Sequence, residues 1–221
     1  MTYSLLLYTL SDTTGWWETV QKGGSVGYII VGLSLVALSL VVMHFMQIRR
    51  SALLPQNQLV TIEKMLAAGQ VQEALEFCVT PANDTYLTKI LATGLLRYQR
   101  SAFGPFELKS SLEEAGEEQT SRLFRSTDAL GLIGTIAPLL GLLGTVLGMV
   151  GAFETLGADS SSNSALAGNI SEALVTTMLG LVLAIPCVAL FSFFRNRIEG
   201  LSSEAASEIE RLVLHLESEQ G

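Results

Sequence analysis

Three long apolar runs interrupt the mixed pattern of hydrophobic and polar positions along the chain. They cover residues 26–46, 129–153 and 173–194, and each is long enough for a membrane-spanning helix, which needs about 20 apolar residues. The second and third runs contain no acidic, basic or histidine side chain, and the first contains only His44. The pattern predicts an all-α integral membrane protein with three transmembrane helices.

Basic residues predict how these helices are oriented. Pairs of arginines follow the first and third runs and precede the second, whereas the connection between the second and third runs contains no lysine or arginine. By the positive-inside rule, the N-terminus lies on the outer side of the membrane and the C-terminus in the cytoplasm. The expected organisation is an outer-side interfacial segment at 1–25, transmembrane helices at 26–46, 129–153 and 169–194, a cytoplasmic helical domain at 47–128, an outer-side turn at 154–168 and a cytoplasmic C-terminal helix at 195–221.

The polar segment between the first two runs is typical of helices separated by turn residues, without the alternation expected of strands. Pro55 and Gly69 are expected to start and end one short helix over 55–69, and the Thr80-Pro81 pair is expected to end a second over 70–79. Asn83 or Asp84 can cap a third helix, which runs to about Arg100.

The second and third runs continue as helices beyond the membrane. Pro105 opens a helix that meets no strong stop before Phe153. After the third run, apolar residues keep helical spacing at Ile198, Leu201, Ala205, Ile209, Leu212 and Leu216. We therefore expect both helices to extend far into the cytoplasm.

Composition excludes several functions. The formal net charge is −8, and no basic patch is present to neutralise phosphates, which argues against nucleic-acid binding. Cys78 and Cys187 have no disulfide partner and no metal-ligand spacing around them, so we expect no metal and no cofactor. Trp16 and Trp17 indicate an interfacial anchor before the first span.

Small residues recur at steps of three and four along the second run, and they predict a face of close helix approach. The face comprises Gly134, Pro138, Gly141, Thr145, Gly148 and Ala152, and Gly144 with Gly148 forms a GxxxG pattern on an adjacent line. These positions either pack a neighbouring helix or line a pore. Pro186 is expected to kink the third span.

Hydroxyl and carboxylate side chains suggest a proton path along these helices. Thr145 and Thr177 can hold a water or pass a proton, and Glu172 stands at the mouth of the third span. Thr176 is an additional hydroxyl that shares the helix face of Glu172. Alternatively, each threonine bonds its own helix carbonyl, and Glu172 is a hydrated residue at a helix start.

Two long motifs resemble the ExbB/TolQ/MotA proton-channel family. Residues 137–153, APLLGLLGTVLGMVGAF, are similar to its second-helix signature, and residues 170–186, ISEALVTTMLGLVLAIP, to its third. The three-span layout fits the ExbB and TolQ branch across the whole chain. By this resemblance Thr145 and Thr177 line the pore, and Glu172 sets the electrostatics or hydration of its outer half.

The resemblance also implies an assembly. Relatives of this kind form a homopentamer, a ring of long helices in the bacterial inner membrane, around single helices of a dimeric ExbD/TolR-like partner that carries an essential membrane Asp. Proton flow past that Asp is coupled to work on the outer side through a TonB- or TolA-like effector. The chain has no aspartate inside a span, which agrees with an Asp supplied by a partner.

Two other classes of function compete with a proton-channel subunit. A non-conducting membrane scaffold keeps the small-residue faces but does not need Glu172 or Thr145. An intramembrane enzyme needs a catalytic pair, and the two histidines, His44 and His215, lie near the inner boundary and in the tail. Because no Ser/His or Asp/Asp pair can form in the spans, we do not expect an enzyme.

Overall fold

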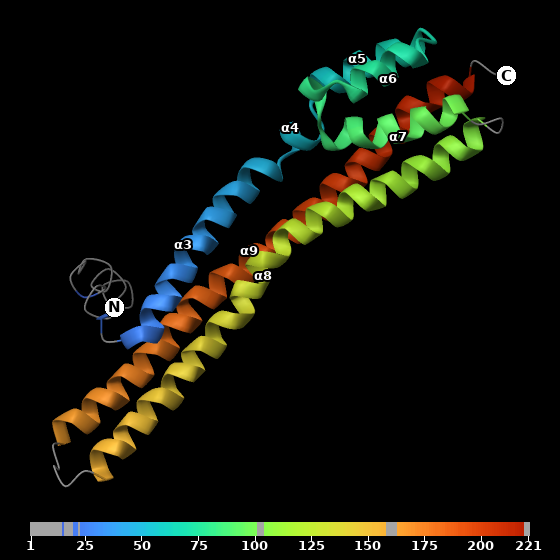
Figure 1. Cartoon of the computed structure of the whole chain (residues 1–221). Helices are drawn as coiled ribbons and strands as arrows, with labels where there is room; N and C mark the ends of the chain where they lie inside the picture. Colours follow the sequence, from blue (N-terminus) through green and yellow to red (C-terminus); the bar gives the residue numbers. More distant parts are fainter. Residues whose placement is uncertain (1–14, 16–19, 22, 101–103, 158–162, 219–221) are drawn as a thin grey trace, which may run out of the picture. The chain divides into compact units, whose positions relative to one another are not determined.

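The computed structural model describes residue 15 and residues 20–21, 23–100, 104–157 and 163–218, and it leaves the side chains at the ends of some of these segments undescribed. Every regular element in this part of the chain is a helix, and three helices are long and apolar enough to cross a membrane (Figure 1). The predicted all-α class with three spans is therefore confirmed. Trp16, Trp17, residues 158–162 of the expected outer-side turn and the side chain of His215 lie outside the described residues. Residues 154–157 and 163–168, also expected in that turn, belong to α8 and α9.

The helices follow one another with short connections. In chain order they are α3 (Gly24–Gln47), α4 (Arg50–Leu53), α5 (Gln56–Ala67), α6 (Val71–Val79), the 3-10 turn η1 (Pro81–Asn83), α7 (Tyr86–Arg100), α8 (Gly104–Gly157) and α9 (Asn163–Ser218). The last two have 54 and 56 residues, so each apolar run continues into a long polar helix, as the sequence predicts. Pro138 and Pro186 lie inside these helices.

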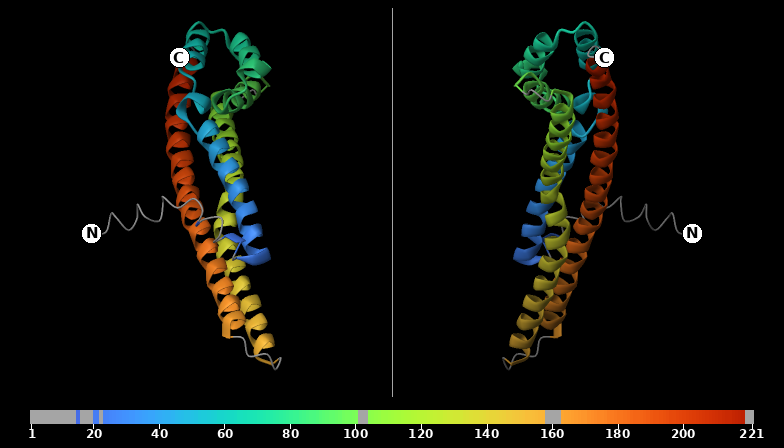
Figure 2. Two further views of the ribbon diagram at one scale, coloured as in Figure 1. Left: turned by 90° about the vertical axis from the view of Figure 1, so that its left-hand side faces the viewer. Right: turned by 90° about the vertical axis from the view of Figure 1, so that its right-hand side faces the viewer.

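The chain divides into two compact units, and α8 and α9 contribute to both. The first unit comprises Met1–Val41 and Ala129–Phe191, and the second comprises Val42–Asp128 and Ser192–Gly221. In the first unit α8 and α9, drawn in yellow and orange, run side by side in both views of Figure 2.

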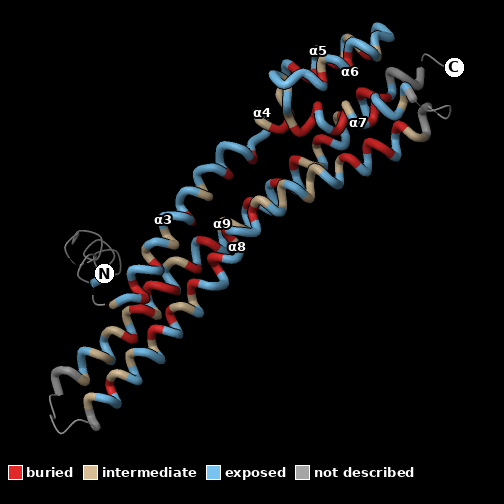
Figure 3. The backbone as a smooth tube through the Cα atoms, in the orientation of Figure 1, coloured by how far each residue is buried: buried red, intermediate tan, exposed pale blue. Residues whose placement is uncertain are grey.

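The first unit leaves most of its apolar surface open. Within the most apolar 18-residue stretch of each spanning helix, 22% is buried in α3, 33% in α8 and 28% in α9. Exposed positions accordingly alternate with buried ones along these helices (Figure 3). Since exposed apolar area is costly in water, this surface is suited to lipid or to further protein chains.

In this unit α3 packs on one face of α9. Val26 and Ile30 form a buried cluster with Leu179 of α9, and Leu140, Val175 and Leu183 pack around it. The three α9 residues, Val175, Leu179 and Leu183, are four residues apart, so they lie on one side of the helix.

The second unit has a leucine-rich core of the kind found in water-soluble helical domains. Leu59, Ile62, Leu66, Leu87 and Leu91 are at most 1% exposed. The predicted stop of the first short helix at Gly69 is confirmed, because this glycine has φ +69°, a left-handed conformation that favours glycine at the end of a helix.

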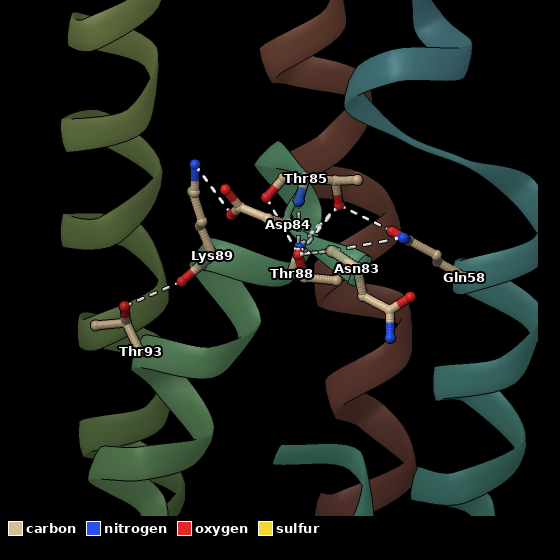
Figure 4. Close-up of polar contacts among 7 residues, drawn as sticks. All are labelled: Gln58, Asn83, Asp84, Thr85, Thr88, Lys89 and Thr93. Atoms are coloured by element: carbon tan, nitrogen blue, oxygen red, sulfur yellow. Dashed lines mark hydrogen bonds and ion pairs between the residues drawn. The ribbon is translucent and has the colours of Figure 1, made fainter. Parts of the chain in front are cut away.

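The cap of α7 differs from the prediction, because Thr85 occupies the position that Asn83 or Asp84 was expected to take (Figure 4). The Thr88 N–H donates to Thr85 Oγ1 at 3.4 Å, and the Thr85 N–H donates to Thr88 Oγ1 at 3.0 Å. The Asn83 amide instead donates to the Phe77 carbonyl, and Asp84 pairs with Lys89 at 3.0 Å. The two side chains are thus engaged elsewhere, and a reciprocal threonine pair starts the helix.

Candidate functional site

The contact between α8 and α9 in the first unit is built from glycines that face the neighbouring backbone. A Cβ added at Gly134 would lie 2.7 Å from Val188 Cγ2, and one added at Gly148 would lie 2.8 Å from Ala173 Cβ. At Gly141 the nearest atom is the Thr177 Cα, at 2.9 Å. The helices therefore approach too closely for any side chain at these positions.

Two more glycines complete this contact. A Cβ at Gly144 would overlap the Thr176 hydroxyl, and on α9 a Cβ at Gly180 would lie 2.5 Å from the Ala137 carbonyl oxygen. Gly180 was not singled out from the sequence, although glycines on both helices are the expected signal of close approach. Pro138 is half-buried in α8, among these positions.

The three threonines of the predicted path occupy different environments. Thr176 is 1% exposed, packs against Gly144 and donates to the Ala173 carbonyl at 2.8 Å. The Thr177 hydroxyl donates across the contact to the Gly141 carbonyl at 3.0 Å. These two hydroxyls therefore belong to the α8–α9 contact.

Thr145 differs from Thr176 in its exposure and from Thr177 in its hydrogen bond. Its hydroxyl donates to the Leu142 carbonyl of its own helix at 2.7 Å, and its side chain is half-buried. Unlike Thr176, it remains open to the surroundings of the unit. A hydroxyl in this position keeps an acceptor lone pair for a water or another chain, because its proton alone is used in the helix bond.

Glu172 points toward α3. Its carboxylate lies against Gly24, the first residue of α3, where an added Cβ would overlap its Oε1. On α9 this residue shares a face with Val175 and Leu179, which pack against α3. Glu172 and Thr176 are therefore close in sequence but serve different neighbours. Gly24 is a residue that the sequence reasoning missed, and its only signal is the Gly23-Gly24 pair before the first span.

His44 lies in the second unit, at the end of α3. It is fully buried, its Nε2 is hydrogen-bonded to the Ser126 carbonyl of α8 at 2.9 Å, and its ring centroid is 5.3 Å from that of Phe194 of α9. The sequence places this residue near the inner boundary of the first span. In the structure it joins α3 to both long helices.

The second unit also contains a groove of about 840 Å³ between α7, α8 and α9. The hydroxyls of Tyr86, Thr120 and Ser202 line it and form a hydrogen-bonded triangle with sides of 2.8, 2.8 and 3.1 Å. Leu112 and Ile209 supply apolar walls. Neither the triangle nor the groove was predicted, because their residues come from three helices that are far apart in sequence.

The arrangement in the first unit can support proton movement only together with other groups. Its spans supply hydroxyls and carbonyls, and the sequence places no acidic or basic residue within 129–153 or 173–194. Among the described residues no group of three or more His, Cys, Asp or Glu side chains is placed to hold a metal ion. A proton path through this unit would therefore need a titrating group from Glu172 or from another chain.

Comparisons with known proteins point to one family. Residues 82–207 match the model of the MotA/TolQ/ExbB proton channel family. Over 201 residues the chain is 31% identical to a Synechocystis sp. protein named as ExbB-like 3, covering 86% of this chain and 91% of the relative. Identity to the biopolymer transport protein ExbB of Pseudomonas putida is 32% over 170 residues, covering 76% and 47%. An ExbB of Xanthomonas campestris is 41% identical over 85 residues, covering 38% and 34%.

Proposed function

The chain belongs to the MotA/TolQ/ExbB proton channel family, and from this premise we propose that it is the channel-forming subunit of an inner-membrane motor that couples a proton gradient to work on the outer side. The family consists of channel proteins and not of enzymes. Three apolar helices and this family together make the chain a protein of the bacterial inner membrane.

The observation that carries the proposal is the different placement of the threonines. Thr176 is buried in the α8–α9 contact and Thr177 donates across it, whereas Thr145 is half-buried and donates only within its own helix. All three lie within the region that matches the family. We assign Thr145 to the wall of the pore and Thr177 to the alignment of the two pore helices. Glu172 acts on the outer half of the path indirectly, from the face of α9 that is turned toward α3.

Another chain supplies the proton carrier. The spans contain no aspartate, so we propose an ExbD/TolR-like partner whose single membrane helix brings an Asp to the level of Thr145. A TonB- or TolA-like effector then receives the work on the outer side. The open apolar faces of α8 and α9 supply the surfaces for lipid, for this partner and for further copies of the chain, which we propose to be five in a ring.

The proposed orientation follows the arginine pairs. The N-terminus lies in the periplasm, and the second unit, which carries all seven of the described arginine and lysine ion pairs, lies in the cytoplasm with the C-terminus. Such exposed pairs contribute at most about 1 kcal/mol each, so they indicate a hydrated surface more than a source of stability.

Proton flux into liposomes tests this function. The chain is reconstituted alone, with its ExbD-like partner, and with the partner and Thr145→Val. We expect flux only with the partner, and we expect Thr145→Val to lower it at least about tenfold, which corresponds to about 1.4 kcal/mol on the barrier.

Thr135→Val is the matched control. Thr135 is exposed on the same helix and donates to its own helix carbonyl, Gly131, at 3.0 Å. Its replacement should leave flux within about twofold. Equal flux in all three proteins contradicts the assignment of Thr145, and no flux from a verified intact complex favours a non-conducting scaffold.

A further inference from the structure

We propose that Glu172 seats the N-terminal end of α3 on α9, with Gly24 as the position that receives its carboxylate. Glu172 is then a positioning residue, which acts through the first span and not as a carrier of the moving proton. This proposal deepens the proposed function, and it depends on that function only for the predicted effect on proton flux. The seat itself is a contact between α3 and α9 within the first unit.

The geometry gives two separate reasons for glycine at position 24. A Cβ there would overlap Glu172 Oε1 and would lie 2.9 Å from its Cδ, so the carboxylate fills the space of the missing side chain. In addition, Gly24 has φ +53°, a backbone conformation that L side chains rarely adopt. The first reason disappears if Glu172 is shortened, whereas the second remains.

Charge favours the same contact. Gly24 is the first residue of α3, and the N–H groups of a first helical turn have no partner within the helix. They form the positive end of the helix dipole, which attracts a carboxylate, and a low-dielectric environment strengthens the attraction. Because the helix has 24 residues, its dipole is fully developed.

Packing below the seat fixes the alignment. Leu179 lies about two turns beyond Glu172 on the same face of α9 and forms the buried cluster with Val26 and Ile30. Next to it, a Cβ on Gly23 would lie 3.3 Å from Leu179 Cδ1. The carboxylate and the apolar cluster thus hold α3 along one line on α9.

This line determines which residues of α9 are presented to α8. With Glu172 and Leu179 turned toward α3, Thr176 packs against Gly144, and Thr177 donates to the Gly141 carbonyl. If the seat is lost, α9 gains freedom to rotate about its axis, and the register of the two threonines against α8 is no longer fixed. On the proposed function, flux then falls although no group of the path is removed.

Electron–electron distance measurements test the seat directly. Nitroxides are attached through Tyr28→Cys and Leu174→Cys, two exposed positions of α3 and α9, in the full-length chain with Cys78 and Cys187 replaced by alanine. Dilution with unlabelled protein removes distances between copies. With Glu172 in place, we expect one narrow distribution of the distance between the two nitroxides. We expect a broad distribution in Glu172→Gln and one of intermediate width in Glu172→Asp, which keeps the charge. A narrow distribution in Glu172→Gln overturns the proposal.

A double-mutant cycle separates the seat from simple backbone strain. Gly24→Ala should lower the unfolding midpoint at least about twice as much with Glu172 present as in the Glu172→Ala background. Gly32→Ala is the control, because an added Cβ at Gly32 has no neighbour within 4 Å. It should have the same effect in both backgrounds. If Gly24→Ala is equally harmful in both, its φ alone explains the glycine and the seat is wrong.

Neither measurement uses proton flux, so the seat and the proposed function can fail independently. If the complex does not conduct protons but the distance distribution is narrow and broadens in Glu172→Gln, the seat is supported and the channel function is contradicted. If the complex conducts protons but Glu172→Gln leaves the distribution unchanged, the channel function is supported and the seat is contradicted.

Discussion

The same two helices pack in different ways along their length. In the first unit α8 meets α9 through glycines, with backbone atoms as the nearest neighbours at Gly141 and Gly180. In the second unit the same two helices bury large side chains, among them Leu108, Leu112, Ile209 and Leu212, which are at most 8% exposed. One pair of continuous helices thus uses two sources of stability.

The solvent explains the difference. In water, burial of a leucine side chain contributes about 1.5–3 kcal/mol, so large residues drive helices together. Lipid is as apolar as leucine, and helix association in it depends on close packing and on hydrogen bonds such as the one from Thr177 to the Gly141 carbonyl. A contact made by glycines leaves little side-chain mass between the helices, so hydroxyls at its edge, such as Thr145, stay accessible.

The largest expected effect comes from filling the glycine contact. Gly141→Leu places a side chain where the nearest atoms are the Thr177 Cα at 2.9 Å and the Thr176 carbonyl oxygen at 3.1 Å. The backbone cannot move aside without separating the helices, so we expect the free energy of unfolding to fall by more than the usual upper value of about 3 kcal/mol for overpacking. Unfolding of the purified wild-type and variant chains in detergent measures this difference.

The control for this substitution is Gly200→Leu in the second unit. A Cβ at Gly200 has no neighbour within 4 Å, so this variant should be neutral or slightly stabilising through its better helix propensity. Equal losses at Gly141 and Gly200 contradict the distinction between the two units.

Truncation of a core leucine should act mainly on the second unit. Leu91→Ala removes a side chain of α7 that is fully buried, and we expect a loss of about 3 kcal/mol. Leu96→Ala on the same helix, where the side chain is 41% exposed, should cost less than about 0.5 kcal/mol. Hydrogen exchange resolves where protection is lost. Loss of protection throughout the first unit by Leu91→Ala would show that the units are not separate.

A smaller effect distinguishes the two threonines. Thr177→Val removes the hydrogen bond to Gly141 and should cost about 0.6 kcal/mol, the average for such bonds between membrane helices. Thr145→Val breaks only a bond within its own helix and should change stability less, while it lowers proton flux at least about tenfold. The comparison is contradicted if Thr145→Val destabilises the chain more than Thr177→Val.

The smallest effect at neutral pH concerns Cys78 in the second unit. Burial raises the pKa of its thiol from 9.0 to about 12, so the folded state keeps a proton that the unfolded state releases above pH 9. The stability that this thiol contributes is therefore fully present below pH 9 and is lost between pH 9 and 12, by at most about 1.4 kcal/mol per pH unit. The difference in urea midpoint between the wild-type chain and Cys78→Ala, followed from pH 8 to 11, measures it. A difference that does not change over this range contradicts the burial of the thiol.

Local patterns in the sequence predict much of the fold. The apolar runs give the three long helices, and Gly69 ends α5 because a left-handed residue after a helix favours glycine. The cap of α7 was missed because Asn83, Asp84 and Thr85 are all good caps. Only the contacts of Asn83 with Phe77 and of Asp84 with Lys89 decide among them.

The candidate site was predicted as a set of residues but not as an arrangement. Helical periodicity places Glu172 and Thr176 on related faces, yet one meets α3 and the other α8. Which neighbouring helix covers each face depends on tertiary packing, and the residue pattern of one helix carries no information about it. Gly24 was missed for the same reason, since its role depends on a carboxylate 148 positions away (172 − 24).

The most direct test of this account is the reactivity of cysteines placed at two threonines. Thr145→Cys and Thr176→Cys are compared in liposomes, with Cys78 and Cys187 replaced by alanine, using a small thiosulfonate reagent that reacts with hydrated thiolate. Because Thr145 is half-buried and Thr176 is 1% exposed, we predict reaction at least about tenfold faster at position 145, slowed by the ExbD-like partner. Equal rates at the two positions, or a faster rate at 176, contradict a pore that runs past Thr145 beside a dry α8–α9 contact.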